Sequence, residues 1–406
     1  MQIQPILAAL RKHKIPAFLI VLEIALACAV LCNAVFMISQ RVGEVQLPNA
    51  IDEAGVSVVS VQGIDPKTAS ADITRDIEAL RQIPGVKAAA AFNMHPLGNN
   101  GWNTNVGTSP SDLMGKDSPN IAEYMFTQGG PEAAGLQLLR GRFFTAEEYA
   151  GSKLGDNYLP TSHVVVVTQS LARRLWPDGN ALGKQLWIGQ QRNYTVIGVV
   201  ANVLRPSENG GGLAHFYWAM FLPVAPAANI QDYLVRSTPQ DRDRVLRDSV
   251  QKLEALSPSV VVKGQTFTEI RDKYFATVRS MVWMLVLVCV VMLAVTAFGI
   301  VGLTSFWVGQ RRRQIGIRRA LGATRRHILA YFQTENFLLS TAGVVLGMLL
   351  AFGINLYLMQ HYQLNRLPWY YLPVSAIALW ILGQLAVLGP ALRAASVPPV
   401  VATRGG

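Results

Sequence analysis

Long apolar stretches recur at four places in this chain, and a large polar region separates the first from the second. The stretches cover residues 15–38, 281–308, 328–359 and 370–388. A helix rises 1.5 Å per residue and needs about 20 residues to cross the hydrocarbon core of a bilayer. The pattern therefore predicts four transmembrane helices and one large water-exposed domain at residues 39–280.

Glu23 is the only charged residue in the first apolar stretch. An ionisable side chain inside lipid costs at least ~2.5 kcal/mol, so it usually faces protein or water. Our first interpretation is a buried hydrogen bond between helices. A role in coupling to protons or substrate, and a position near the membrane edge, are the alternatives.

The first apolar stretch also has to be weighed against a cleaved signal peptide. A signal peptide has a shorter apolar core, about 7–15 residues, followed by a cleavage site of small residues. Residues 15–38 are too long for such a core and lack a convincing site. We therefore expect an uncleaved span preceded by a cytoplasmic segment, residues 1–14.

The polar region alternates strand-like and helix-like patterns. Residues 55–61 and 86–92 are typical of strands, and residues 70–83 between them have apolar positions at helical spacing. The same order recurs at residues 232–263. Two βαβ units at the ends of one domain predict a ferredoxin-like α+β fold. Further strands and turns, at about residues 95–222, predict a β-rich inserted subdomain.

Two patterns concern how the spans connect and pack. Helical spacing runs from Phe267 to Val278 and reaches the second span without a glycine or proline, which predicts a continuous helical stalk. The third span contains Gly343 and Gly347 at the GxxxG spacing that lets two helices approach closely. Ordinary glycine usage in membrane helices explains that spacing equally well.

Composition supports an integral membrane protein. Hydrophobic residues make up 51% of the 406 residues and charged residues only 15%, with a formal net charge of +11. Most of the arginine clustering lies beside apolar stretches, where the preference for positive charge on the cytoplasmic side accounts for it. We therefore expect membrane lipid, and no nucleic acid, as a partner.

Motifs for catalysis or metal binding are absent from the sequence. It contains no HExxH, paired CxxC or GxSxG pattern, and its six histidines follow no ligand spacing. The three cysteines, Cys28, Cys32 and Cys289, lie in apolar stretches, so the polar region folds without disulfides. We expect a chain that is not an enzyme and binds no cofactor or metal itself.

The segment at residues 309–327 concentrates arginine between the second and third spans. Apolar residues such as Ile317 and Leu321 alternate with the arginines, Gly322 interrupts the helical pattern, and Thr324 can cap a following helix. A loop that only sets topology needs no apolar residues. With the N-terminus inside, this segment and the tail at residues 389–406 both lie in the cytoplasm.

Three stretches carry a resemblance to a known family. RRRQIGIRRALGATRRHILAYFQTE and the ending GPALRAASVPPVVATR resemble the permease region of FtsX/MacB-type ABC transporters. VVVVTQSLARRLWPDGNALGKQLWIGQQRNYTVIGVVANV resembles the extracytoplasmic domain of MacB-type permeases. The resemblance implies an ABC transporter permease that transmits mechanical change without passing substrate between its spans.

The resemblance also assigns residues. Relatives commonly have glutamate where this chain has Gln314, and Glu335 matches an acidic residue frequently found at the start of the third span. With Glu23, Glu335 is the second acidic residue expected in the membrane. By position, the segment that couples to the ATPase comprises Ile315, Gly316, Ile317, Arg318, Leu321, Gly322, Ala323, Arg325 and Arg326.

Partners follow from the same resemblance. It implies a second permease subunit, identical or similar, and a separate dimeric ABC ATPase that binds ATP and Mg²⁺. We expect a multi-pass protein of the bacterial inner membrane with a periplasmic domain, working in efflux with a periplasmic adaptor and an outer-membrane channel. Lipoprotein release, or regulation of a periplasmic enzyme or sensor, are the alternatives.

Overall fold

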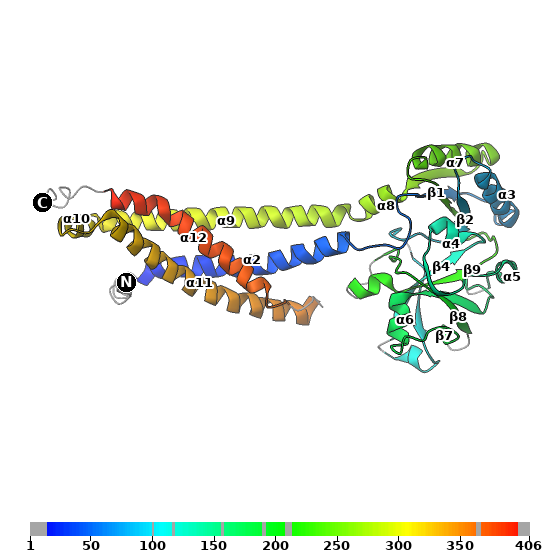
Figure 1. The fold of residues 1–406 in the computed structure, drawn as a ribbon, viewed down its shortest axis with the longest axis horizontal. Coiled ribbons are helices and arrows are strands. Elements are labelled where there is room, and N and C mark those ends of the chain that lie inside the picture. Colours follow the sequence, from blue (N-terminus) through cyan, green and yellow to red (C-terminus); the bar gives the residue numbers. More distant parts are fainter. Residues whose placement is uncertain are drawn as a thin grey trace. The chain divides into compact units, whose positions relative to one another are not determined.

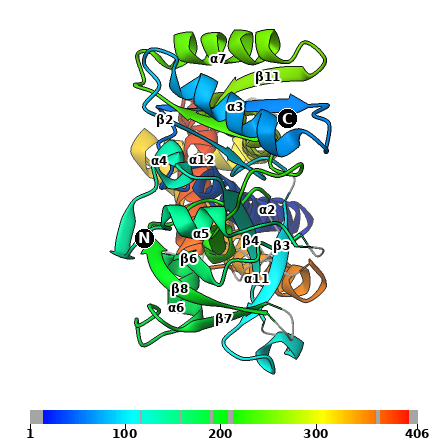
Figure 2. The same cartoon turned by 90° about the vertical axis from the view of Figure 1, so that its right-hand side faces the viewer.

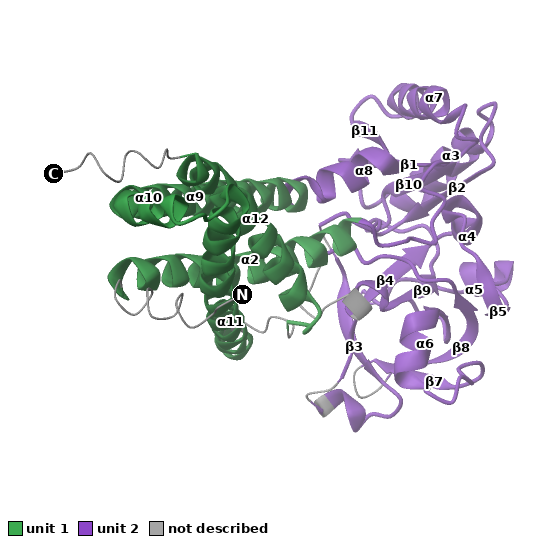
Figure 3. Ribbon diagram, turned by 60° about the vertical axis from the view of Figure 1, so that its left-hand side comes forward, with its two compact units in different colours: residues 1–45, 278–406 green, residues 46–277 purple. Residues whose placement is uncertain are grey.

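The computed structural model divides the chain into two compact units (Figure 3). Unit 1 comprises Met1–Val45 and Val278–Gly406, and unit 2 comprises Gln46–Thr277. The structure describes residues 14–99, 101–115, 118–155, 158–188, 192–207, 213–362 and 367–396. Most of the predicted cytoplasmic segment 1–14 and residues 397–406 of the predicted tail lie outside these ranges.

Unit 1 contains four helices that are long and apolar enough to cross a membrane (Figure 1), which confirms the predicted class of fold. Each helix extends beyond the apolar stretch that predicted it. Residues 389–395, predicted as the start of a tail, continue the last helix through Pro390. The four helices are α2 (Lys14–Val45), α9 (Ala276–Gln310), α11 (Arg325–Tyr362) and α12 (Tyr371–Ala395).

Close contact between α2 and α11 depends on the two glycines of the GxxxG spacing. A Cβ added to Gly343 would lie 2.8 Å from Ile24 Cβ, and one added to Gly347 would lie 2.5 Å from Cys28 Cβ. Neither position has room for a larger residue. The prediction that this spacing serves close helix approach is therefore confirmed.

Unit 2 has a ferredoxin-like part built from the two predicted βαβ units. Its four strands lie in the order β11-β1-β10-β2, and every neighbouring pair is antiparallel. Apolar residues of α3 and α7 share one core with the sheet (Figure 2). The elements are β1 (Val56–Gln62), α3 (Ala69–Arg81), β2 (Ala88–Phe92), β10 (Asp232–Arg236), α7 (Arg242–Leu256) and β11 (Val261–Thr266).

The insert between β2 and β10 is rich in strands, as predicted, but it extends the same sheet, which has eleven strands in all. Strands β7 and β8 pair antiparallel as a hairpin, with the connecting residues 189–191 outside the described ranges. The insert contains β3 (Asn103–Gly107), η1 (Asp112–Met114), β4 (Asn120–Phe126), α4 (Gly130–Ala134), β5 (Leu138–Gly141), α5 (Ala146–Ala150), β6 (Val164–Thr168), α6 (Gln169–Leu175), β7 (Gln185–Ile188), β8 (Arg192–Val200), η2 (Leu213–Tyr217) and β9 (Ala219–Pro223).

The two parts of the sheet meet between β2 and β4. Only one pair of residues, Phe92 and Phe126, continues the strand pairing across this boundary. Side chains add further hydrogen bonds: the Ala91 amide donates to Thr127 Oγ1 at 2.9 Å, and the Met125 amide donates to Asn93 Oδ1 at 2.9 Å. Backbone bonds flank them: the Asn93 amide donates to Met125 O at 3.3 Å, and the Thr127 amide donates to Ala91 O at 2.9 Å. Backbone and side-chain hydrogen bonds therefore hold the boundary together.

The predicted continuous stalk is wrong at one point. Helix α8 (Phe267–Tyr274) ends at Phe275, and α9 begins at Ala276. Phe275 is buried, and its ring lies 5.5 Å from the Arg271 guanidinium, which itself pairs with Glu53 at 2.7 Å. Phe275 is thus packed in unit 2, and the regular helix is interrupted there although no glycine or proline marks the position.

A buried polar contact holds α3 against the sheet. The Tyr233 hydroxyl on β10 donates to Asp76 Oδ2 on α3 at 2.9 Å, and Arg75 pairs with the same carboxylate at 2.8 Å. Asp76 and Tyr233 are both buried. A buried donor left without its acceptor costs about 1–3 kcal/mol, so each partner depends on the other.

We expect Tyr233→Phe to lower the local free energy of unfolding of β10 by about 1 kcal/mol, and Asp76→Ala by about 2–3 kcal/mol, because the second change leaves the buried Tyr233 hydroxyl without its acceptor. Hydrogen exchange of β10 amides in the full chain, followed by mass spectrometry, measures both changes. Tyr158→Phe, at an exposed tyrosine, is the control and should leave exchange unchanged. Equal effects of all three substitutions would contradict the role of this contact.

Candidate functional site

The predicted coupling segment forms a short helix followed by a tight turn. Helix α10 (Arg312–Ala320) follows directly after α9. Gly322 has a φ of +94°, a conformation that glycine adopts without strain, and the Ala323 amide donates to Arg318 O at 3.0 Å. The His327 amide donates to Thr324 Oγ1 at 3.3 Å, so the predicted cap of the next helix is present.

Helix α10 has a buried face and an exposed face. Ile315 and Gly316 are buried, and Ile315 belongs to the same apolar cluster as residues of α11. Ile317 and Leu321 are 48% and 83% exposed. Residues 311–335 contain seven arginines and one acidic residue, Glu335. The segment therefore presents two apolar side chains in strongly positive surroundings.

The remaining predicted residues lie around this exposed face. The Arg318 guanidinium lies 5.1 Å from the centre of the Tyr331 ring on α11, a cation–π contact. Arg325 and Arg326 are exposed in the first turn of α11, and Ala323 is partly exposed in the turn before it. Predicted residues thus lie together on one short helix, one turn and the next helix start.

An ion pair that the sequence did not suggest fixes the base of this segment. Arg311 Nη1 donates to both carboxylate oxygens of Glu335, at 3.1 and 3.2 Å. Arg311 is 9% exposed and Glu335 is 2% exposed, and the guanidinium also lies 5.4 Å from the centre of the Trp307 ring. The pair joins the junction of α9 and α10 to the first third of α11.

Glu23, the other acidic residue predicted in the membrane, lies elsewhere. A Cβ added to Gly299 on α9 would overlap the Glu23 carboxyl, so the glycine makes room for it. Among the residues that the structure describes, the Glu23 carboxyl forms no hydrogen bond or ion pair. The contact with Gly299 is only steric and assigns no function to the Glu23 carboxyl. The role of Glu23 therefore stays a prediction.

Family comparisons agree with this architecture. The model of the MacB-like periplasmic core domain matches residues 18–268, and that of the FtsX-like permease C-terminal region matches residues 286–399. The chain belongs to the MacB/FtsX-like permease family. The resemblance predicted from the sequence is thereby confirmed, and unit 2 is its MacB-like domain.

Curated relatives of this permease are larger proteins. It is 27% identical over 277 residues to the macrolide export ATP-binding/permease protein MacB of Chromobacterium violaceum, covering 66% of this chain and 40% of that protein. It is 24% identical over 392 residues to the MacB protein of Bdellovibrio bacteriovorus, covering 90% and 52%. The chain thus spans about half the length of these relatives.

Two solved extracytoplasmic domains align with part of this permease. The extracellular domain of the ABC-type transporter YknZ from Gram-positive bacteria aligns at 16% identity, covering 51% of this chain and 99% of that one, with a TM-score of 0.33. The periplasmic region of MacB from Actinobacillus actinomycetemcomitans aligns at 15% identity, covering 55% and 94%, with a TM-score of 0.36.

Arg311 could not be singled out from the sequence, because six other arginines lie in the same segment and its partner is 24 residues away. The available signal was Glu335 itself. A carboxylate in an apolar span needs a cation, and the arginines at the end of the preceding span are the nearest source. Which arginine reaches Glu335 depends on the turn at Gly322, which sets the direction of α11 after α10.

We expect Arg311→Met and Glu335→Met each to destabilise unit 1 by about 3–5 kcal/mol, because each leaves a buried charge without its partner. The double substitution should cost less than either single one. Apparent thermal midpoints of the full chain in detergent, read by size-exclusion chromatography, measure the three variants. Additive effects of the two substitutions would contradict a direct ion pair.

Proposed function

We propose that this chain is the non-catalytic membrane subunit of an ABC transporter, which relays ATP-driven movement of a separate cytoplasmic ATPase to its MacB-like domain. The observation that carries the proposal is the exposed face of α10. Leu321 is 83% exposed in a turn that is itself well fixed by hydrogen bonds. A short helix with exposed apolar and basic side chains suits a groove in a protein partner.

The contacts of α10 support transmission of movement. Ile315 packs into the apolar cluster of unit 1, and the ion pair of Arg311 with Glu335 joins the start of α10 to α11. Helix α9 is 35 residues long and runs from Ala276 to this junction. Unit 2, which contains the MacB-like domain, ends at Thr277, so one helix connects that unit to the junction. A displacement of α10 is therefore passed to a long, continuous helix.

The complete transporter is part of the same proposal. A second permease subunit pairs with this one, and a dimeric ABC ATPase carries ATP and Mg²⁺. Export is the favoured process, since the two relatives described above are named macrolide export proteins. A periplasmic adaptor and an outer-membrane channel complete the path across a bacterial envelope.

Replacing both Ile317 and Leu321 by aspartate should abolish binding of the ATPase, because it places unpaired charge in an apolar contact. Co-purification with candidate ABC ATPases from solubilised membranes measures the complex, and ATPase assays in lipid measure its stimulation. We expect at least a tenfold loss of complex, with an unchanged amount of protein in the membrane.

Gln314→Glu is the matched control for this experiment. It adds a negative charge to an exposed position of the same helix without removing an apolar side chain. The control should retain the complex. If the doubly substituted chain also retains it, α10 is not the docking element.

The proposed orientation predicts which side of the membrane each unit faces. Ser70 on α3 and Gln314 on α10 are both exposed, whereas the three native cysteines are buried. A cysteine at position 70 should react with a membrane-impermeant maleimide in intact spheroplasts, and one at position 314 only after permeabilisation. The reverse result would overturn the orientation.

A further inference from the structure

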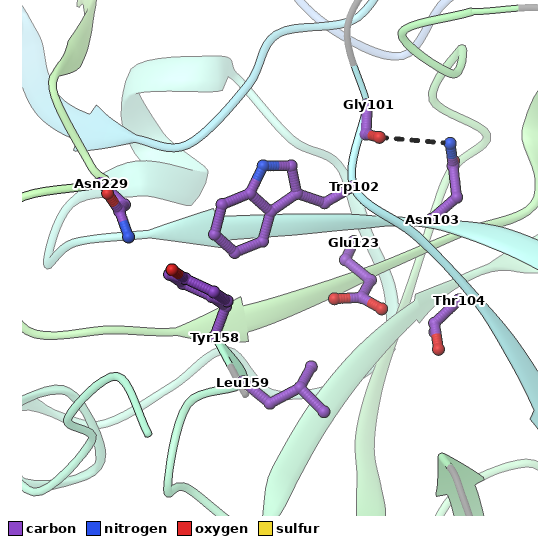
Figure 4. Close-up of a pocket in the computed structure, with 8 residues that line it drawn as sticks. All are labelled: Gly101, Trp102, Asn103, Thr104, Glu123, Tyr158, Leu159 and Asn229. Carbon is purple, nitrogen blue, oxygen red and sulfur yellow. Dashed lines mark hydrogen bonds between the residues drawn. The ribbon is translucent and has the colours of Figure 1, made fainter. Parts of the chain in front are cut away.

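The MacB-like domain contains an open cavity of about 730 Å³ that the proposed relay does not use. Pockets of about 300–1,000 Å³ hold small organic ligands. Strands β3 and β4 and the segments before β6 and β10 supply its walls (Figure 4). The lining residues are Gly101, Trp102, Asn103, Thr104, Glu123, Tyr158, Leu159 and Asn229.

Glu123 places a carboxyl group in the wall of this cavity. It lies on β4 between the core residues Ile121 and Met125, and it is only 5% exposed. Its amide donates to Trp102 O at 2.9 Å, which fixes the strand beside the cavity. Among the residues that the structure describes, no arginine, lysine or histidine pairs with this carboxyl. A buried carboxylate without a cation is costly.

Aromatic rings stand beside the carboxyl. The Trp102 and Tyr158 rings meet edge to face with their centres 5.5 Å apart, and Figure 4 shows both rings at the side of the cavity next to Glu123. Tyr158 is half exposed although its ring has this partner. Aromatic faces attract cations and also bury the apolar part of a ligand.

We propose that this cavity binds a small organic cation, with its ammonium group at Glu123 and its apolar body against Trp102 and Tyr158. The cation would supply the positive charge that the carboxyl lacks among the described residues. The proposal concerns the isolated permease and does not depend on the docking of an ATPase, so the two can fail separately.

Protonation of Glu123 provides a second test of the proposal, because binding of a cation should then depend on pH. Burial raises the pKa of Glu123 to about 7, and a hydrogen bond from Thr104 opposes that rise only in part. Other titratable or charged groups near it are Tyr158 in the wall and two residues of β8: Tyr194, whose pKa is raised by burial, and Arg192, which donates to Leu159 O at 3.2 Å. Glu123 is thus the group expected to titrate near neutral pH.

Benzyltrimethylammonium is a suitable probe, because its charge is permanent and any pH dependence of binding must come from the protein. Its binding to the full chain in detergent can be measured by ligand-observed NMR, with empty micelles as the blank. We expect at least a tenfold weaker affinity in Glu123→Gln and a weaker affinity in Trp102→Leu. Benzyl alcohol, which is neutral, should show only the partitioning seen with empty micelles.

Glu78→Gln provides the matched control. Glu78 is an exposed glutamate that lines a second cavity of the same domain, about 260 Å³, together with Tyr149. This variant should bind the probe as the unaltered chain does. Equal affinity of the unaltered chain and Glu123→Gln, or equal loss in Glu78→Gln, would overturn the proposal.

The affinity of the unaltered chain should rise about tenfold between pH 6 and pH 8, as a carboxyl with a pKa near 7 becomes ionised, and should stay flat in Glu123→Gln. A raised carboxyl pKa means that the folded state loses stability as pH rises through 7. Glu123→Gln should therefore match the unaltered chain in thermal midpoint at pH 5 and exceed it at pH 8.5. If this variant does not fold, Trp102→Leu decides: unchanged binding would sink the proposal.

Discussion

The membrane unit depends, at its arginine-rich end, on one buried ion pair. Two charges removed from water are stable together only when their geometry is good, and Arg311 meets both oxygens of Glu335. That contact fixes where α9 ends relative to the first third of α11. Helix α10 starts at the next residue, Arg312, so the direction in which it presents Ile317 and Leu321 follows from the pair.

Three acidic residues in apolar surroundings show three different arrangements. Glu335 is neutralised within the chain by Arg311. Glu23 lies against Gly299 and has no hydrogen bond or ion pair within the described residues. Glu123 faces a cavity in the MacB-like domain. Among the described residues, only the first arrangement pairs the acid with a cation of the chain.

Much of the fold could be predicted from periodicity. Apolar length gave four spans, and the repeated order of strand and helix gave the ferredoxin-like part. The break at Phe275 could not be predicted, because no glycine or proline marks it and the burial of Phe275 in unit 2 is a tertiary property. Nor could the sequence show that the insert continues the sheet, since pairing of Phe92 with Phe126 is a tertiary contact.

The sequence predicted which residues make up the candidate site, but it did not predict the contacts that they form. Apolar positions among the arginines and the turn at Gly322 were readable from the sequence. The exposed fraction of Leu321 was not, since an apolar side chain is buried by default. Glu123 was missed for a related reason. One acid in a short strand of apolar residues has no partner that spacing alone could identify.

The boundary between β2 and β4 has a mechanical consequence. Elsewhere in the ferredoxin-like part, neighbouring strands are joined by repeated backbone pairs: five residue pairs join β1 to β10, and five join β10 to β2. One pair joins β2 to β4, and Asn93 and Thr127 supply further bonds through their side chains. Two backbone hydrogen bonds, between Asn93 and Met125 and between Thr127 and Ala91, also cross this line. The stiffness of the domain there therefore depends in part on two side chains, which mutation can change, and not on the backbone alone.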